Sequence, residues 1–245
     1  MDYPFLMDVT GIRLITFDCY GTLIDWETGM LSTLRQLFSQ TRPAIPDAKL
    51  LELYGEAEAE IEAGPYQRYR NVLSETVQAM GSRLGVQVTP GEEEQFANSL
   101  KHWEPFPDTV AALKTLGSRF KLGIISNVDD DLFAASQKKL DVKFDVVVTA
   151  EQVQSYKPAL KNFQEVLRRS GLKEEQVLHA GQSVYHDIIP TNSLGIRNVW
   201  VNRPSLRPGS GAAKPASAQP SLEVQSLAEL ATVLTAGTQA AAKRS

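Results

Sequence analysis

Five short apolar segments alternate with longer amphipathic ones along most of the chain. The short segments are rich in β-branched residues and apolar at nearly every position, which is typical of strands buried on both faces of a parallel sheet. The longer segments repeat their apolar residues at helical spacing. This alternation predicts a three-layer α/β core. The expected strands are residues 13–17, 121–126, 144–149, 177–180 and 197–202, and the expected core helices are 107–116, 131–140, 159–170 and 188–194.

Residues 25–105 interrupt that alternation, because they contain no convincing strand segment and are rich in Glu, Ala, Leu and Gln. We predict a helical cap over 25–105, inserted into an α/β core made of 1–24 and 106–245. Near the C-terminus, residues 203–221 are rich in Pro, Ser, Gly and Ala, which predicts a flexible loop before a short helix near 222–234. The cap helices are expected at 30–40, 48–63, 68–84 and 92–101.

Composition narrows the function classes. The 245 residues include 25 basic and 29 acidic side chains, and a net charge of −4 gives no electrostatic reason to expect nucleic acid or an anionic membrane as partner. No run of about 18 apolar residues occurs, and the N-terminus lacks a secretory signal. The single cysteine, Cys19, excludes an intramolecular disulfide and fits a reducing compartment. We therefore expect a cytoplasmic protein that acts on a small molecule.

The strongest chemical signal is the segment FDCYGTL at residues 17–23. It places Asp18 at the carboxyl end of the first strand, where open α/β sheets bind their ligands. The following Gly21 and Thr22 let the chain turn away sharply and leave N–H groups near the carboxylate. An isolated aspartate after a strand more often caps a helix or a turn, so the weight of this signal depends on what the other strand ends carry.

Three further strand ends carry polar side chains. The segments are ISN at 125–127, SYKP at 155–158 and GQSVYHD at 181–187. Together with Asp-x-x-Gly-Thr, this order resembles the four motifs of the haloacid dehalogenase-like hydrolases over residues 11–202. The resemblance implies a Rossmann-like core with a helical cap, and a catalytic group of Asp18 as nucleophile with Ser126, Lys157 and Asp187.

Two positions bear on the kind of reaction. Phosphatases of this family usually carry a second aspartate two residues after the nucleophile and an acid after the glycine of the fourth motif, whereas this chain has Tyr20 and Gln182. Because Mg²⁺ favours carboxylate ligands, both changes point away from metal-dependent phosphoryl transfer. The Asp-x-Tyr-Gly-Thr motif is instead similar to that of the (S)-2-haloacid dehalogenases, which use no metal or other cofactor.

This closer resemblance implies a role for each matching residue. Asp18 would displace halide from C2 of a short (S)-2-haloacid, and water would cleave the resulting ester to give the 2-hydroxy acid. Asp187 and Lys157 would form a charged pair beside Asp18. The expected substrate-binding residues are Cys19 and Tyr20 (through their N–H groups, with Ser126), Thr22, Asn127 and Ser183.

Two departures leave alternatives open. Dehalogenases carry an arginine in the early cap that draws off the halide, but here Arg42, Arg68 and Arg70 are candidates without matching context, and Val184 stands where those enzymes have asparagine. One alternative is a Mg²⁺-dependent phosphatase with Asp18, Tyr20 and Asp187 as ligands. The other is a catalytically quiet member that binds a metabolite or partner. The resemblance also leaves a homodimer open.

Histidines and aromatic residues give weaker signals. His186 beside Asp187 fits either a general base or a half-exposed residue at a helix start. His179 lies within a strand and is more typical of a packed core histidine. The aromatic residues in or near the cap are more typical of cap core than of a pocket lining. They are Trp26, Tyr54, Tyr66, Tyr69, Trp103 and Phe106.

Overall fold

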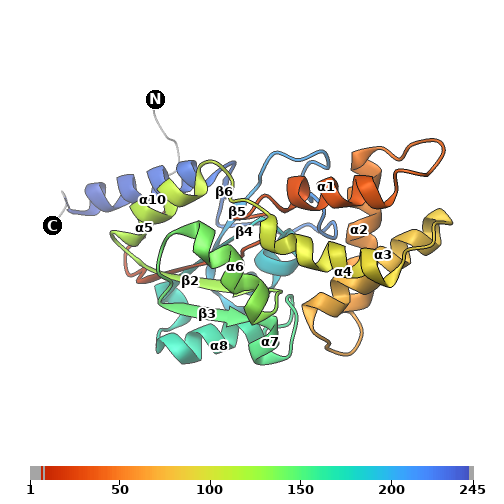
Figure 1. Cartoon of the computed structure of the whole chain (residues 1–245). Helices are drawn as coiled ribbons and strands as arrows, with labels where there is room; N and C mark the ends of the chain where they lie inside the picture. Colours follow the sequence, from red (N-terminus) through yellow and green to blue (C-terminus); the bar gives the residue numbers. More distant parts are fainter. Residues whose placement is uncertain (1–6, 8, 243–245) are drawn as a thin grey trace.

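A single parallel sheet organises the computed structural model, which describes residue 7 and residues 9–242 (Figure 1). The strand order β3-β2-β1-β4-β5-β6 places β1 between β2 and β4, and Phe17 at the end of β1 is in register with Ile124 and Ala180. The chain builds the sheet outward from β1 in one direction and then in the other, so a ligand site is expected at the carboxyl ends of β1, β2 and β4. The strands are β1 Leu14–Phe17, β2 Lys121–Ser126, β3 Val146–Thr149, β4 Val177–Gly181, β5 Arg197–Val201 and β6 Leu222–Val224.

Helices cover both faces of the sheet, which confirms the expected three-layer α/β class. Ile15 and Phe17 of β1 join one apolar cluster, while Leu14 joins the other, as alternation along a strand requires. Helices α5 (Thr109–Gly117), α6 (Asp130–Leu140) and α10 (Leu227–Ala242) contribute to the first cluster. The short helix α7 (Ala150–Val153) and helices α8 (Lys161–Ser170) and α9 (Ile189–Leu194) border the second.

Four helices between β1 and α5 form the inserted unit, called the cap below (Figure 1). Asp25 starts the first of them because its side chain accepts the N–H of Thr28, earlier than the predicted start at residue 30. A capping box between Thr89 and Glu92 starts the last. The helices are α1 Trp26–Leu37, α2 Asp47–Glu62, α3 Tyr69–Leu84 and α4 Pro90–Ser99, followed by the 3₁₀ turn Leu100–His102.

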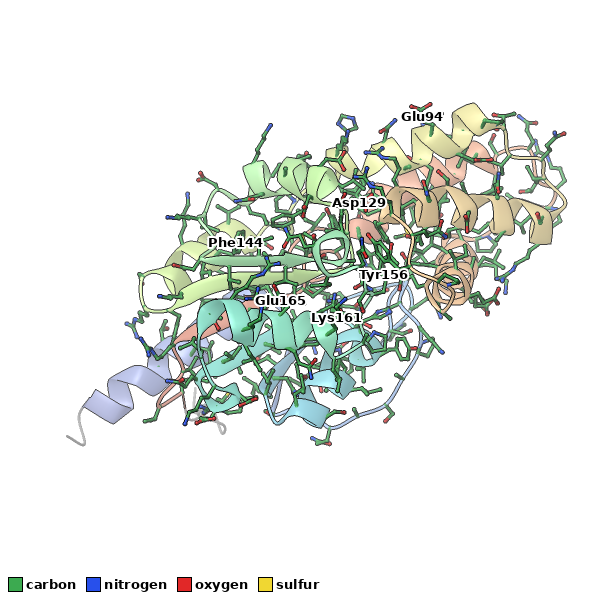
Figure 2. All side chains as sticks on the ribbon, turned by 90° about the horizontal axis from the view of Figure 1, so that it is seen from below. Glu94, Asp129, Phe144, Tyr156, Lys161 and Glu165 are labelled. Carbon is green, nitrogen blue, oxygen red and sulfur yellow. The ribbon has the colours of Figure 1, made fainter. Side chains whose placement is uncertain are left out.

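Side chains of the core hold the cap in place. The buried carboxylate of Asp129 accepts the first N–H groups of α3, from Tyr69 at 2.8 Å and Arg70 at 3.0 Å. The Tyr156 hydroxyl donates to the Gln67 carbonyl at 2.7 Å. Figure 2 shows Asp129 and Tyr156 where the sheet domain meets the cap helices. The cap is therefore anchored by hydrogen bonds at its α2–α3 connection.

The C-terminal region differs in part from expectation. Residues 222–224, predicted as the start of a helix, form edge strand β6 beside β5, because their backbone groups pair with the last strand before helix α10 begins. Residues 204–221 contain no helix or strand. Ala212 and Ala213 in this segment are nonetheless buried, and Arg207 reaches the Leu51 carbonyl of α2 at 3.3 Å. The flexibility of the loop stays a prediction, as do the domain boundaries.

Two remaining elements complete the core. A 3₁₀ turn, Glu174–Gln176, leads into β4, and a π-helical turn, Val184–Ile188, follows it and precedes α9. π-helical turns of this kind often occur at functional sites.

Among the residues that the structure describes, 7 and 9–242, no helix is both long enough and apolar enough to cross a bilayer.

Candidate active site

Asp18 lies just beyond β1, held from two sides. Its Oδ2 accepts the hydroxyl of Thr22 at 2.9 Å, and its Oδ1 accepts the ammonium of Lys157 at 2.8 Å. Thr22 in turn accepts the N–H of Gln182 at 2.8 Å, which ties the turn after β1 to the end of β4. Burial raises the pKa of the Asp18 carboxyl, and the charge of Lys157 opposes that rise. The orientation of the Asp18 carboxylate is thus fixed at the carboxyl end of the central strand β1.

Lys157 joins Asp18 to Asp187. Its Nζ lies 2.6 Å from Asp187 Oδ1, and the lysine side chain is only 2% exposed. Burial lowers the pKa of Lys157, but the charges of the two aspartates outweigh that effect and raise it overall. Burial likewise raises the pKa of Asp187, but Lys157 and a hydrogen bond with His179 bring it below its usual range. The group therefore carries two carboxylates around one ammonium ion.

The surroundings of Asp187 fix its position. Its Oδ1 also lies 3.2 Å from His179 Nε2, and its Oδ2 accepts the N–H of Ser183 at 3.2 Å. A Cβ at Gly181 would come within 2.4 Å of the Asp187 carboxyl, so only glycine permits this close approach. His179 is fully buried, as expected, but it also orients Asp187.

A small cavity of about 40 Å³ opens beside Asp18. This volume holds a few water molecules or a very small substrate. The core contributes residues that end or follow β1, β2 and β4, with Lys157 from the loop after α7 and Ala213 from the segment 204–221, and the cap covers them with α1, α2 and α3. The lining comprises Asp18, Tyr20, Trp26, Glu58, Glu62, Tyr69, Ser126, Asn127, Lys157, Gln182, Ser183, His186, Asp187 and Ala213.

Unused hydrogen-bond donors lie on the core side of the cavity. The hydroxyl of Ser126 is buried without a partner among the described residues. Within the same part of the chain, no acceptor is found for the backbone N–H groups of Cys19 and Tyr20. Buried donors are rarely left unsatisfied, so the two donors whose residues line the cavity, the Tyr20 N–H and the Ser126 hydroxyl, are suited to bind an anionic oxygen of a ligand.

Asn127 holds the lysine loop. Its Oδ1 accepts the N–H of Lys157 at 2.7 Å, and its Nδ2 donates to the Lys157 carbonyl at 3.2 Å. Its Nδ2 is also 3.4 Å from both carboxyl oxygens of Glu62. Asn127 therefore both lines the cavity and positions the lysine.

The opposite wall is acidic. Helix α2 brings Glu58 and Glu62 to the cavity, one helical turn apart. Sequence reasoning missed both, although Tyr54, Glu58 and Glu62 recur every fourth residue on the face that Leu50 buries. That register places the two acids on the buried side of α2, where glutamate is rare unless it has a partner.

Other expected residues lie elsewhere. None of the three arginine candidates for a halide site lines the cavity: Arg68 and Arg70 pair with Asp131, and Arg42 bonds backbone carbonyls at the α1–α2 connection. Cys19 and Thr22 are buried behind the cavity wall, and Thr22 positions Asp18. Among the aromatic residues expected to form cap core, Trp26 and Tyr69 belong to the buried apolar cluster and also line the cavity.

A Mg²⁺ ion would need oxygens of Asp18 and Asp187, but both oxygens of Asp18 already accept hydrogen bonds, from Thr22 and Lys157. Both carboxylate oxygens of Asp187 already accept donors of the chain, and Gln182 supplies no charge. In the part of the chain that the structure describes, no group of three or more His, Cys, Asp or Glu side chains is arranged to hold a metal. The donor set therefore fits a metal poorly.

The fold and this carboxylate–lysine–carboxylate group define a capped α/β hydrolase. The family model for haloacid dehalogenase-like hydrolases matches residues 15–201, and the chain belongs to that family.

Individual members of the family share only a modest part of the sequence with this chain. An (S)-2-haloacid dehalogenase of Pseudomonas putida is 24% identical over 228 residues, covering 90% of this chain and 95% of that protein. A glyceraldehyde 3-phosphate phosphatase of Methanothermobacter thermautotrophicus is 31% identical over 140 residues, covering 56% and 61%. The structure of the Xanthobacter autotrophicus L-2-haloacid dehalogenase with chloropropionic acid covalently bound matches with a TM-score of 0.76 at 19% identity, covering 91% and 98%. At this identity the structural likeness shows the fold alone.

Proposed function

We propose that the protein is a metal-independent hydrolase that forms an ester on Asp18, and that it acts as 2-haloacid dehalogenases do. The observation that carries this proposal is Asp18 held between Thr22 and Lys157, with the neutral residues Tyr20 and Gln182 where phosphatases carry acids. The likeness to the Pseudomonas putida enzyme along nearly the whole chain supports the same reading.

In the first step, a carboxylate oxygen of Asp18 attacks C2 of a short (S)-2-haloacid, and the carbon–halogen bond breaks with its electron pair leaving on the halide. The unsatisfied N–H of Tyr20 and the hydroxyl of Ser126 support a role in binding the substrate carboxylate. A halide leaves without a proton, so this step needs no general acid at position 20.

In the second step, water attacks the carboxyl carbon of Asp18. The ester bond breaks, the 2-hydroxy acid departs, one proton is released to solvent, and the Asp18 carboxylate is restored. The positive charge of Lys157, 2.8 Å from Asp18 Oδ1, stabilises the negative charge that develops on the carboxyl oxygens.

The test is a single turnover in heavy-oxygen water followed by mass spectrometry of the Asp18 peptide. We expect ¹⁸O in Asp18 during turnover of (S)-2-chloropropionate, chloride release that EDTA leaves unchanged, and at least a thousandfold loss in Asp18→Asn. Turnover without label in Asp18 would refute the ester route.

Two other outcomes favour the alternatives. Phosphate release from a phosphate ester that EDTA abolishes would make the protein a metal-dependent phosphatase. Inertness in both assays, with metabolite or partner binding intact in Asp18→Asn, would indicate a binding protein.

A further inference from the structure

Four carboxyl groups and one ammonium group line the cavity. The acids are Asp18 and Asp187 from the core and Glu58 and Glu62 from the cap, and the only cation among the lining residues is Lys157, which is already bonded to both core acids. His186 is neutral near pH 7, because burial, with Lys157 and Lys214 nearby, lowers its pKa to about 4 against the opposing charge of Asp187. An anionic group at the cap end would therefore meet carboxyl groups and no free cation.

Glu58 has one oxygen left for a ligand. Its Oε1 accepts two hydroxyl groups, from Tyr54 at 2.7 Å and from Tyr69 at 2.7 Å. Its Oε2 has no donor among the described residues, although the side chain is buried. The two tyrosines thus fix the carboxyl group of a residue that lines the cavity, and they leave its second oxygen available to a ligand.

Glu62 is partnered only weakly. Its oxygens lie 3.4 Å from Asn127 Nδ2, and its Oε2 is 3.6 Å from His186 Nε2. Contacts of this length are poor hydrogen bonds. The Glu62 side chain is only 7% exposed, so water does little to replace a missing donor. A ligand that donates hydrogen bonds would satisfy it.

A second, independent feature points to a ligand of defined polarity. Ser126 also lines the cavity, and its buried hydroxyl lacks a partner. With the N–H of Tyr20, it offers donors on the core side, whereas Glu58 and Glu62 offer acceptors on the cap side. The cavity is therefore polarised, with one end suited to an anion and the other to a cation.

We infer that Glu58 and Glu62 form a substrate-selecting subsite for a primary ammonium group, so that the preferred substrate is a small zwitterion. It carries a carboxylate beside the reacting carbon and an ammonium group on the next carbon. The subsite presupposes the Asp18 ester chemistry proposed above and adds the class of substrate to it. Simple 2-haloacids, which lack the ammonium group, then react slowly.

Binding tests the subsite without requiring turnover. We expect the intact protein to bind 3-amino-2-hydroxypropanoate at least tenfold more tightly than lactate of matching configuration, measured by calorimetry at pH 7. Glu62→Gln and Glu58→Gln should each reduce this ratio toward one. Glu56→Gln is the matched control, because Glu56 lies on the same helix, pairs with Arg83 at the surface and is 52% exposed; it should leave the ratio unchanged.

Turnover separates the subsite from the chemistry. We expect 3-amino-2-chloropropanoate to exceed 2-chloropropionate at least tenfold in kcat/KM after subtraction of the uncatalysed rate, with the Glu62→Gln effect mainly in KM. Equal chloride release from both compounds would overturn the subsite and leave the dehalogenation standing. Selective binding of the amino acid without any chloride release would leave the subsite and refute the dehalogenation. Lactate binding as tightly as the amino compound would overturn the subsite whatever the activity.

Discussion

Protonation of His186, which lines the cavity, makes the free energy of unfolding depend on pH. Burial lowers its pKa to about 4, with Lys157 and Lys214 adding to the effect and Asp187 opposing it, whereas an unfolded histidine titrates near 6.5. Between these values the unfolded chain binds a proton that the folded chain does not, so the stabilisation is complete above about pH 6.5 and falls as the pH decreases toward 4.

The expected result is measured by urea unfolding. From pH 7 to pH 5, wild type should lose about 2 kcal/mol more free energy of unfolding than His186→Phe, which keeps an aromatic ring without a titrating nitrogen. The phenylalanine also loses the contact of Nδ1 with Ser183, but that loss is nearly the same at both pH values. Parallel curves for the two proteins would show that His186 does not titrate differently in the folded state.

At the residue scale, the sequence predicts the core half of the site far better than the cap half. Ser126 is the last residue of β2, and Asp18 and Asp187 follow β1 and β4 of the same parallel sheet. Parallel strands bring their carboxyl ends to one side of the sheet regardless of other details. Glu58 and Glu62 could not be placed this way, because their position depends on the rotation of α2 and the docking of the whole cap. No local pattern encodes that docking.

At the scale of elements, helix α3 begins on a residue of the core. Asp129 is fully buried, and its two oxygens accept the N–H groups of Tyr69 and Arg70. A carboxylate at a helix N-terminus is favoured both by these hydrogen bonds and by the helix dipole. Removing it leaves two N–H groups without partners where the cap joins the core.

Asp129→Ala should lower the free energy of unfolding by about 2–3 kcal/mol and increase proteolysis within the cap. Asp129→Asn, which keeps one accepting oxygen, should lose less. Asp131→Ala is the control, because Asp131 pairs with Arg68 and Arg70 at the surface and is 49% exposed. Urea unfolding and limited trypsin digestion measure both effects, and equal losses in the Asp129 and Asp131 alanine variants would contradict the anchoring role.

Some strands match the bounds predicted from the sequence, whereas one strand was not predicted at all. Strands β1, β2 and β5 lie within one residue of the predicted ends, because dense β-branched apolar segments are unambiguous in a buried sheet. β6 was missed because three residues are too few for a periodic pattern, and its pairing with β5 is decided by a partner some twenty positions earlier. Such edge strands form through long-range hydrogen bonding that local propensity does not report.

At the scale of the whole molecule, the segment 204–221 links the core to the cap, because it connects two core strands and packs against cap helices α1 and α2. It passes so close to α2 that a Cβ at Gly55 would lie 2.2 Å from the Ala212 carbonyl oxygen, and its residue Ala213 lines the cavity. Ser205 in the same segment bonds Glu27 of α1 at 2.8 Å. The segment therefore forms a wall of the site as well as a connection.

Gly55→Ala tests this link. The added methyl group forces the segment away from α2, so we expect the free energy of unfolding to fall by about 1–3 kcal/mol and Trp26, which lines the cavity, to become more accessible to acrylamide quenching. Gly91→Ala is matched in chemistry and lies on cap helix α4, but nothing lies within 4 Å of its added Cβ. It should leave stability equal or slightly higher, because alanine restricts the unfolded chain. If both variants unfold at the same urea concentration and show the same tryptophan quenching, the segment does not hold the cap against the core. In that case Asp129, the anchor of α3, is what positions Glu58 and Glu62 of α2.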